Sequence, residues 1–176
     1  MTETKWPSRM VRMLLVDVDG TLTDGGLYYS AEGLTLKRFD VRDGLGLRLL
    51  AEAGVEVAIV SADDSPVTAA RARKLGITRV VQGCDDKGEA VRRLLAEAGV
   101  EAGEACFMGD DLTDLAAFAE VGHTAAPADA VPQVRAAAQY VTRARAGQGA
   151  VRELCDRLLE TGERQVASGK WQGSSP

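Results

Sequence analysis

Short segments rich in Val, Ile and Leu alternate along the chain with longer Ala-rich segments of helical period. This rhythm predicts repeated strand-helix units that form a doubly wound, Rossmann-like α/β fold around a parallel sheet. The expected strands are residues 11–17, 55–60, 78–82, 105–109, 123–126 and 139–142. The expected helices are residues 44–53, 65–75, 87–98, 112–121, 130–137 and 149–160, several of them closed by a glycine.

Residues 25–39 interrupt this rhythm with two short β-prone runs on either side of a Ser-Ala-Glu-Gly turn. The pattern predicts a β-hairpin that is inserted after the first strand and projects from the core. The chain has 176 residues, enough for one domain. We place this domain at residues 10–161, between an N-terminal tail at 1–9 and a flexible, polar C-terminal tail at 162–176.

The charge and the cysteines limit the kinds of partner and site. The formal net charge of -5 gives no basic field, so neither nucleic acid nor an anionic membrane is an expected partner. No apolar run approaches the roughly 20 residues of a membrane span, and we therefore expect a cytoplasmic protein. Cys84, Cys106 and Cys155 are widely separated and form no Cys-x-x-Cys pair, which favours buried thiols over a disulfide framework or a zinc site.

Two carboxylates, Asp17 and Asp19, follow the first expected strand directly. In open α/β sheets, ligands bind at the carboxyl ends of the strands. Side chains two positions apart in an extended segment share a face, and Gly20 allows a tight turn that aims backbone N–H groups at an anion. Taken alone, however, Asp-x-Asp-Gly fits a solvated strand-to-loop turn better than a site.

The next strand ends carry complementary chemistry. Ser61 follows the second expected strand and offers a hydroxyl to a phosphate oxygen, while Lys87, after the third, could hold a phosphate or be an ordinary surface lysine. The fourth strand leads into Asp110, Asp111 and Asp114, of which the last two could be helix N-terminal caps. Clustered carboxylates with positions left for water and phosphate suit Mg²⁺. The sequence therefore predicts a magnesium site at this edge of the sheet.

These motifs stand in a fixed order at successive strand ends: Asp17-Val18-Asp19-Gly20-Thr21, Ser61, Lys87 and Gly109-Asp110-Asp111-Leu112-Thr113-Asp114. Together they resemble the four motifs of the haloacid dehalogenase superfamily of aspartate-nucleophile phosphatases. The hairpin and the segments 39–44 and 147–153 further resemble the 3-deoxy-manno-octulosonate 8-phosphate phosphatase family and its relatives that act on nonulosonate 9-phosphates, in lipopolysaccharide or sialic acid-like biosynthesis. The resemblance covers about residues 10–160.

The resemblance implies a Mg²⁺-dependent phosphomonoesterase that works through an aspartyl-phosphate on a fold without a cap domain. In this interpretation Asp17 is the nucleophile and Asp19 is the general acid and base. The Mg²⁺ would be held by Asp17, the backbone carbonyl of Asp19 and Asp110. Ser61 and Lys87 would complete the phosphate pocket.

The resemblance also names residues around this centre. The expected supporting residues are Thr21, Asp111 and Asp114. Thr21 could orient Asp19 or be a plain turn hydroxyl. The expected substrate-binding residues are Asp40, Arg42, Asp43, Gly44, Arg48, Asp63 and Arg71. Each of these arginines could instead be a solvated surface charge.

The second motif bears on the identity of the substrate. It reads Ser61-Ala62-Asp63-Asp64-Ser65-Pro66-Val67, closer to the Ser-Thr-Glu-Lys-Asn-Pro-Val of acylneuraminate-associated relatives than to the Thr-Gly-Arg of many octulosonate phosphatases. An arginine could pair with a substrate carboxylate, whereas Asp63 can only accept hydrogen bonds from hydroxyl or amide groups. We expect a 2-keto-3-deoxy sugar acid with a terminal phosphate, either an octulosonate 8-phosphate or a nonulosonate 9-phosphate, with the nine-carbon acids slightly preferred.

The spacing of the motifs leaves no room for a cap domain. An uncapped monomer would leave the reacting centre open to water and would recognise a sugar poorly. We therefore expect a homo-oligomer, specifically a tetramer, in which the apolar hairpins meet around a symmetry axis and neighbouring chains close the site. The alternative is that the hairpin packs against its own domain.

Three other functions fit parts of this pattern. A signalling receiver domain is also doubly wound, but receivers carry their phosphorylated Asp after the third strand, and here strand 55–60 ends at Ser61. A catalytically silent assembly module would not need the full set of acids. A phosphatase for another small or macromolecular phosphate ester would suit an open site, although the acidic net charge weakens the nucleic-acid version.

Overall fold

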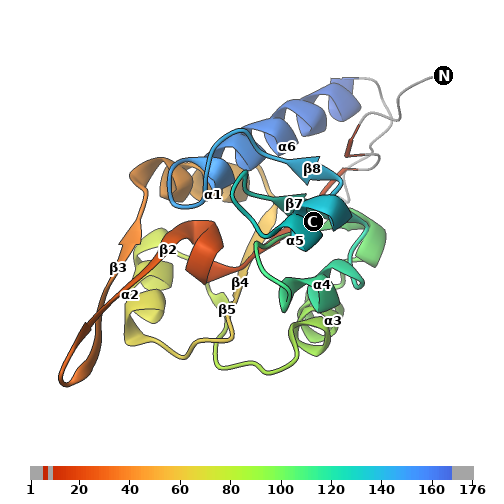
Figure 1. Ribbon diagram of the computed structural model, residues 1–176. Coiled ribbons are helices and arrows are strands. Elements are labelled where there is room, and N and C mark those ends of the chain that lie inside the picture. The colour runs from red at the N-terminus through yellow and green to blue at the C-terminus, as the bar shows by residue number, and fades with distance from the viewer. Residues whose placement is uncertain (1–5, 8–9, 168–176) are drawn as a thin grey trace.

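The computed structural model describes residues 6–7 and 10–167, with the backbone alone at 162–167. Six strands form one parallel sheet in the order β5-β4-β1-β6-β7-β8. They are β1 (Met13–Val16), β4 (Glu56–Val60), β5 (Arg79–Val81), β6 (Ala105–Met108), β7 (His123–Ala126) and β8 (Tyr140–Val141). Helices cover both faces of the sheet, which confirms the predicted doubly wound α/β fold (Figure 1).

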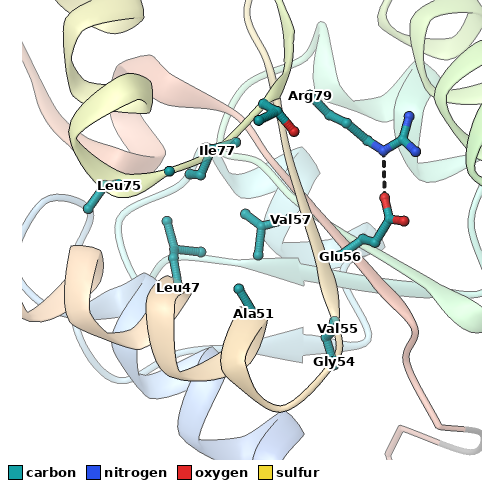
Figure 2. Close-up of a pocket in the computed structure, with 11 residues that line it drawn as sticks. Leu47, Ala51, Gly54, Val55, Glu56, Val57, Leu75, Ile77 and Arg79 are labelled. Atoms are coloured by element: carbon teal, nitrogen blue, oxygen red, sulfur yellow. Dashed lines mark hydrogen bonds and ion pairs between the residues drawn. The ribbon is translucent and has the colours of Figure 1, made fainter.

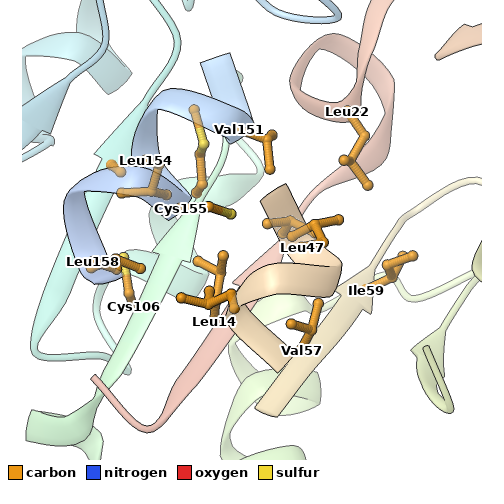
Figure 3. Packing of buried hydrophobic residues seen from close by; sticks show 14 of the residues in the cluster. Leu14, Leu22, Leu47, Val57, Ile59, Cys106, Val151, Leu154, Cys155 and Leu158 are labelled. Atoms are coloured by element: carbon orange, nitrogen blue, oxygen red, sulfur yellow. The ribbon is translucent and has the colours of Figure 1, made fainter. Parts of the chain in front are cut away.

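Each face of the sheet has its own apolar core. One face is covered by α1 (Val41–Glu52), α2 (Pro66–Leu75) and α6 (Ala150–Ala167), the other by α3 (Lys87–Ala98), α4 (Asp114–Phe118) and α5 (Pro132–Ala137). On the first face, Leu47 and Leu154 belong to the same buried cluster as Leu14 of the central strand (Figure 3). Burying one such side chain contributes about 1.5–3 kcal/mol. The two cores therefore hold the central strands, and their ends, in fixed positions.

Local sequence signals set several helix ends. The first helix, α1, begins at Val41 rather than at residue 44, because the side chain of Asp40 caps it by accepting a hydrogen bond from a backbone N–H of the first turn. Ser65 and Asp86 cap α2 and α3 in the same way. Gly76 ends α2 in the left-handed conformation that favours glycine.

Some expected ranges need correction. The helix expected at 112–121 is reduced to the five residues of α4, because turns closed by backbone hydrogen bonds precede and follow it. The last helix, α6, continues to Ala167, so residues 162–167 of the expected tail are helical. Trp6, in the expected N-terminal tail, stacks on Tyr140 with ring centroids 4.9 Å apart. The rest of the expected C-terminal tail, 168–176, lies outside the described residues.

Two smaller expectations can be compared with the structure. Cys106 and Cys155 are buried thiols, as predicted, and Cys84 is half-buried. Within residues 6–7 and 10–167, no helix combines the length and the apolar character needed to cross a bilayer.

The hairpin consists of β2 (Thr23–Ser30) and β3 (Gly33–Phe39), which pair antiparallel and project from the body of the molecule (Figure 1). The apolar side chains Leu27, Tyr28, Tyr29 and Leu36 are exposed, so the hairpin does not pack them against its own domain. Lys37, near the base of the hairpin, is buried instead. The hairpin thus exposes apolar side chains and buries a charge, the reverse of the usual arrangement in a soluble sheet.

Candidate active site

The motif residues lie at the carboxyl edge of the sheet. Strand β1 is the middle strand of β4-β1-β6, so Asp17, Ser61 and Asp110 follow three adjacent parallel strands. The start of α3 brings Lys87 to the same edge, where its side chain contacts Asp17. The chain order of the motifs therefore becomes a spatial cluster, as the rule for open α/β sheets predicts.

Lys87 is buried between two carboxylates. Its Nζ lies 2.5 Å from Asp17 Oδ1 and 2.6 Å from Asp114 Oδ1. Burial alone would lower the pKa of Lys87, but the two carboxylates outweigh it and raise this pKa above its usual value, so the lysine stays charged. Burial raises the pKa of Asp17 well above its usual value, repulsion from Asp114 adds to the rise, and Lys87 opposes it. One ammonium group does not offset all the negative charge gathered here.

Asp110 is held against the turn that follows β1. Gly20 in this turn has a φ of 91°, and a Cβ at residue 20 would lie 2.1 Å from Asp110 Oδ2. Only glycine therefore lets the two segments come this close. The hydroxyl of Thr21 donates a hydrogen bond to Asp110 Oδ1 at 3.0 Å, so Thr21 orients Asp110 rather than Asp19. Burial, followed by repulsion from a neighbouring carboxylate, raises the pKa of Asp110 to about 6.

Asp114 is the scaffold of the acidic turn. Its Oδ2 accepts hydrogen bonds from the backbone N–H groups of Asp110 and Asp111, at 2.8 and 3.0 Å, while Oδ1 binds Lys87. Gly109 leaves space for this arrangement, because a Cβ there would lie 2.4 Å from the carboxyl carbon of Asp114. The exposed side chain of Asp111 accepts a hydrogen bond from the backbone N–H of the next residue, Leu112, but it does not cap α4, because the residue before this helix is Thr113.

Three carboxylates at this edge could hold a metal ion. Asp17, Asp110 and Asp114 each offer an oxygen, and the three oxygens lie within 4.8 Å of one another. Hard oxygen donors at this spacing suit a cation such as Mg²⁺. The raised pKa values of Asp17 and Asp110 arise from burial and crowded negative charge, which a bound cation would relieve. Because Asp114 already binds Lys87 and the backbone, Asp17 and Asp110 are the better placed side chains.

Asp19 has a partner that the sequence analysis did not single out. Lys37 places its Nζ 2.7 Å from Asp19 Oδ2 and 2.7 Å from Asp63 Oδ2. Asp63 thus faces a cation of its own chain. Ser61, buried at the end of β4, accepts a hydrogen bond from the backbone N–H of Asp63 at 3.2 Å. The available signal in the sequence was that Lys37 occurs beside apolar residues in an expected strand. The strand pattern, however, did not show whether the lysine side chain faces the domain or the solvent.

Two of the expected substrate-binding arginines share a partner at the start of α1. Arg42 lies 2.9 Å from the Asp40 carboxylate and donates to the carbonyl of Gln148, also at 2.9 Å, while 61% of its side chain stays exposed. Arg71 donates to the backbone carbonyl of Asp40 at 3.1 Å. Gly44 makes room for this arginine, since a Cβ at residue 44 would lie 2.4 Å from Arg71 Nη2. The structure therefore groups Asp40, Arg42, Gly44 and Arg71.

Asp43 and Arg48, also expected to bind substrate, lie elsewhere. Asp43 is buried and accepts hydrogen bonds from the backbone N–H groups of Arg152, at 2.8 Å, and Gly149, at 3.4 Å, so it anchors the start of α6. Burial raises the pKa of Asp43, and these two hydrogen bonds oppose the rise. Arg48 is exposed on α1 and lies 4.0 Å from Glu52, one helical turn away. In this chain Asp43 connects two helices and Arg48 belongs to a surface ion pair.

A cavity of about 680 Å³ lies at the opposite edge of the sheet, where β4 and β5 begin (Figure 2). Leu47, Leu75 and Ile77 form part of its apolar wall, and Glu56 and Arg79 form an ion pair there at 2.5 Å. Its lining contains a single carboxylate, so it lacks the paired acids found at the carboxyl edge. Size alone would favour this cavity as a ligand site, but its chemistry does not fit hydrolysis of a phosphate.

Comparison with known proteins gives consistent matches. Residues 38–122 match the haloacid dehalogenase-like hydrolase family. A 3-deoxy-D-manno-octulosonate 8-phosphate phosphatase of Yersinia pestis is 43% identical over 165 residues, which cover 94% of this chain and 85% of the relative.

Solved structures of similar proteins give the same result. The cobalt-bound deoxy-D-mannose-octulosonate 8-phosphate phosphatase of Haemophilus influenzae is 40% identical, with a TM-score of 0.85 over 92% of this chain and 97% of that one. The 3-deoxy-D-manno-octulosonate 8-phosphate phosphatase of Moraxella catarrhalis, in complex with a magnesium ion, a phosphate ion and a KDO molecule, is 37% identical, with a TM-score of 0.84 over 92% of this chain and 94% of that one. Sequence and fold are thus shared over nearly the whole chain.

Proposed function

Because this chain belongs to the 3-deoxy-D-manno-octulosonate 8-phosphate phosphatase family of haloacid dehalogenase-like hydrolases, it is a phosphomonoesterase, and we propose that its substrate is 3-deoxy-D-manno-octulosonate 8-phosphate. One observation carries the proposal: Lys87 is buried between Asp17 and Asp114, beside Asp110, in a chain 43% identical to a phosphatase of that name. Because the family consists of phosphatases, membership in it argues against the two alternatives of a receiver domain and a catalytically silent module.

The first half of the proposed reaction transfers the phosphoryl group to the protein. A carboxylate oxygen of Asp17 forms a bond to phosphorus while the bond between phosphorus and the sugar oxygen breaks. The departing sugar oxygen takes the proton of the Asp19 carboxyl group, so the sugar leaves as an alcohol. The charged Lys87, 2.5 Å from Asp17, keeps the nucleophile in place and can also bind a phosphate oxygen.

The second half releases phosphate. A water oxygen bonds to phosphorus, the Asp19 carboxylate takes a proton from this water, and the bond from phosphorus to Asp17 breaks. Inorganic phosphate leaves, and both aspartates return to their starting states. Ser61, which is buried at the end of β4, would donate its hydroxyl hydrogen to a phosphate oxygen.

We propose Mg²⁺ as the cofactor, held by Asp17, Asp110 and the backbone carbonyl of Asp19. When bound, it would offset the repulsion between the ionised nucleophile and the phosphate. The raised pKa values of Asp17 and Asp110 support this proposal, because a bound cation would stabilise the ionised forms of both side chains. Removing divalent ions with a chelator is expected to abolish turnover, and added Mg²⁺ to restore it, whereas full activity in excess chelator would contradict the proposal.

We also propose a homo-oligomer, a tetramer, as the active unit. The exposed side chains of the hairpin form an apolar surface that contact between copies would cover. Neighbouring chains would then supply groups that recognise the sugar, joining Asp40, Arg42, Gly44 and Arg71 of this chain.

A substrate panel tests the proposed function. We would measure kcat/KM for 3-deoxy-D-manno-octulosonate 8-phosphate, for nonulosonate 9-phosphates and for 4-nitrophenyl phosphate. The octulosonate ester is expected to have the highest value. A higher value for a nine-carbon acid would show that the second motif, with Asp63, predicts the substrate better than overall identity does. No turnover of any of the three with Mg²⁺ present would overturn the proposal.

A further inference from the structure

Lys37 connects three separate parts of the chain at one point. It lies on β3 of the hairpin, and its Nζ contacts Asp19 in the turn after β1 and Asp63 in the loop after β4, both at 2.7 Å. The hydroxyl of Thr68, on α2, is 3.5 Å away. The side chain of Lys37 has no exposed surface, whereas those of Asp19 and Asp63 are 27% and 44% exposed.

The fold alone does not require a lysine at this position. Burying an ammonium group costs desolvation free energy, and an apolar side chain of similar length would fill the same space without that cost. Neither carboxylate needs a buried cation for its own solvation, because both reach solvent. An unfavourable buried charge that contacts a reactive carboxylate points to a task in the reaction.

The two oxygens of Asp19 differ in their surroundings. Oδ2 accepts the hydrogen bond from Lys37, while Oδ1 is buried and has no hydrogen-bond partner among the described residues. A group that exchanges a proton with substrate and water needs one oxygen that is held and another that no protein group occupies, and Oδ1, although buried, is the unoccupied one. Lys37 supplies the holding contact, and Asp63 gives Lys37 a second contact that holds it in turn.

We propose that Lys37 is a positioning residue for proton transfer: it holds the carboxyl group of Asp19 in the place from which it serves the leaving oxygen, and Asp63 holds Lys37. The inference rests on the proposed function, because it assumes that Asp19 is the general acid. It gives Asp63 a role that does not involve the substrate. It also makes the base of the hairpin part of the catalytic apparatus.

The leaving-group dependence of Lys37→Met tests the proposal. Phenyl phosphate and 4-nitrophenyl phosphate have similar shapes, but phenolate needs protonation to leave far more than nitrophenolate does. Their kcat/KM values report the step in which the leaving group departs. We expect Lys37→Met to lose about 100-fold in kcat/KM with phenyl phosphate and less than about 5-fold with 4-nitrophenyl phosphate, because well-placed general acids contribute roughly 10²–10⁴-fold. Equal losses with both substrates would overturn the proposal.

Three further variants complete the design. Asp63→Ala removes one of the two carboxylates that hold Lys37. It should also lose more kcat/KM with phenyl phosphate than with 4-nitrophenyl phosphate, but both losses should be smaller than those of Lys37→Met. This variant serves as the test if Lys37→Met does not fold. Lys37→Arg keeps a donor and should recover part of the phenyl phosphate activity. Arg93→Met removes one positive charge from an exposed side chain on α3 and should leave both values unchanged. A wild-type protein inactive on all substrates would overturn the proposed function and this inference with it, whereas an active wild type with equal losses would overturn the inference alone.

Discussion

At the scale of single residues, the acids at the carboxyl edge differ in their partners. Asp17 contacts a buried lysine of α3, Asp19 a buried lysine of the hairpin, and Asp110 the hydroxyl of Thr21. Asp114 binds the backbone. The proposed function gives these carboxylates, which are of the same chemical type, different roles: nucleophile for Asp17, proton carrier for Asp19, metal ligand for Asp110 and scaffold for Asp114.

The first prediction concerns Asp17→Asn. The amide is nearly isosteric with the carboxylate but is not a usable nucleophile, so turnover should fall by at least about 10⁴-fold. In chelator, the unfolding temperature should stay unchanged or rise, since the amide removes a charge that burial disfavours. Steady-state assays and thermal unfolding measure the two effects. A variant that keeps a tenth of wild-type activity would contradict the assignment.

The second prediction concerns Gly20→Ala. A Cβ there would lie 2.1 Å from Asp110 Oδ2, so the variant must displace this carboxylate, and the Mg²⁺ concentration for half-maximal activity should rise by at least about tenfold. Gly54→Ala is the matched control. Gly54 has a φ of +87°, close to the +91° of Gly20, but a Cβ at residue 54 meets no atom within 4 Å. Both variants carry about 1–2 kcal/mol of backbone strain. An equal change in Mg²⁺ requirement would show that strain, not Asp110, is the cause.

The sequence could predict the positions of Asp17, Ser61, Lys87 and Asp110, because parallel strands place their carboxyl ends at one edge. It could not predict the contacts of Lys37, because an antiparallel hairpin can turn either face towards the domain. The residues of the hairpin do not by themselves determine how it is positioned against the core.

At the scale of elements, α1 and α6 depend on each other although they are far apart in the chain. The side chain of Asp43, in the first turn of α1, accepts hydrogen bonds from the backbone N–H groups of Gly149, just before α6, and Arg152, in the first turn of α6. Gly46 permits close packing, because a Cβ at residue 46 would lie 3.2 Å from Cys155 Cβ. Disturbing Asp43 should therefore affect stability before it affects catalysis.

The third prediction is the pH dependence of Asp43→Asn. Burial raises the pKa of Asp43 in the folded chain, so the folded state holds this proton more tightly than the unfolded state. The stabilisation from protonated Asp43 is present at low pH and is lost as the pH rises through the folded-state pKa. The asparagine has no charge to desolvate and still offers an acceptor oxygen.

Urea unfolding should be measured for Asp43→Asn and wild type at about pH 4.5 and about pH 7.5. The free energy of unfolding of the variant, minus that of wild type, should be greater at the higher pH. Glu52→Gln, an exposed carboxyl on the same helix, is the control and should show little change. A relative stability of Asp43→Asn that falls as the pH rises would contradict the sign of the shift.

Local signals predicted several elements closely. The helix expected at 87–98 and the strand expected at 123–126 have the observed bounds, Lys87–Ala98 and His123–Ala126, because caps and turns mark their ends. The role of Asp43 was not predictable in this way. The backbone N–H groups that donate to Asp43 belong to residues 106 and 109 positions later in the chain. These hydrogen bonds form only once α6 packs on α1.

At the scale of the whole molecule, the hairpin is the element whose exposed surface is hardest to account for in a single chain. It exposes four large apolar side chains, while its base contributes Lys37 to the site. Contact between hairpins of different copies would cover these side chains, and by holding the hairpin it would also hold Lys37. The tetramer therefore remains a prediction that links assembly to activity.

The fourth prediction concerns the double variant Tyr28→Ser, Tyr29→Ser. Light scattering should report a smaller species than wild type, because these side chains are 53% and 67% exposed in one chain and would form the centre of the contact. Activity on the sugar phosphate should fall by at least about tenfold, with a smaller effect on 4-nitrophenyl phosphate. Val141→Ser, an exposed apolar residue on β8, should leave the size unchanged. A wild type that is monomeric and fully specific would refute the prediction.

The scaffold formed by Asp114 has a consequence for how the activity of the enzyme responds to Mg²⁺ in a cell. Its two oxygens fix the acidic turn and Lys87 through hydrogen bonds within the chain, so the turn that carries Asp110 takes its shape when the chain folds. An ion that does not have to organise its own site can leave and return without any refolding. The rate of the enzyme would then follow the free Mg²⁺ concentration from moment to moment. Molecules that lack the ion would be an intact reserve, protected from proteases and ready for immediate use.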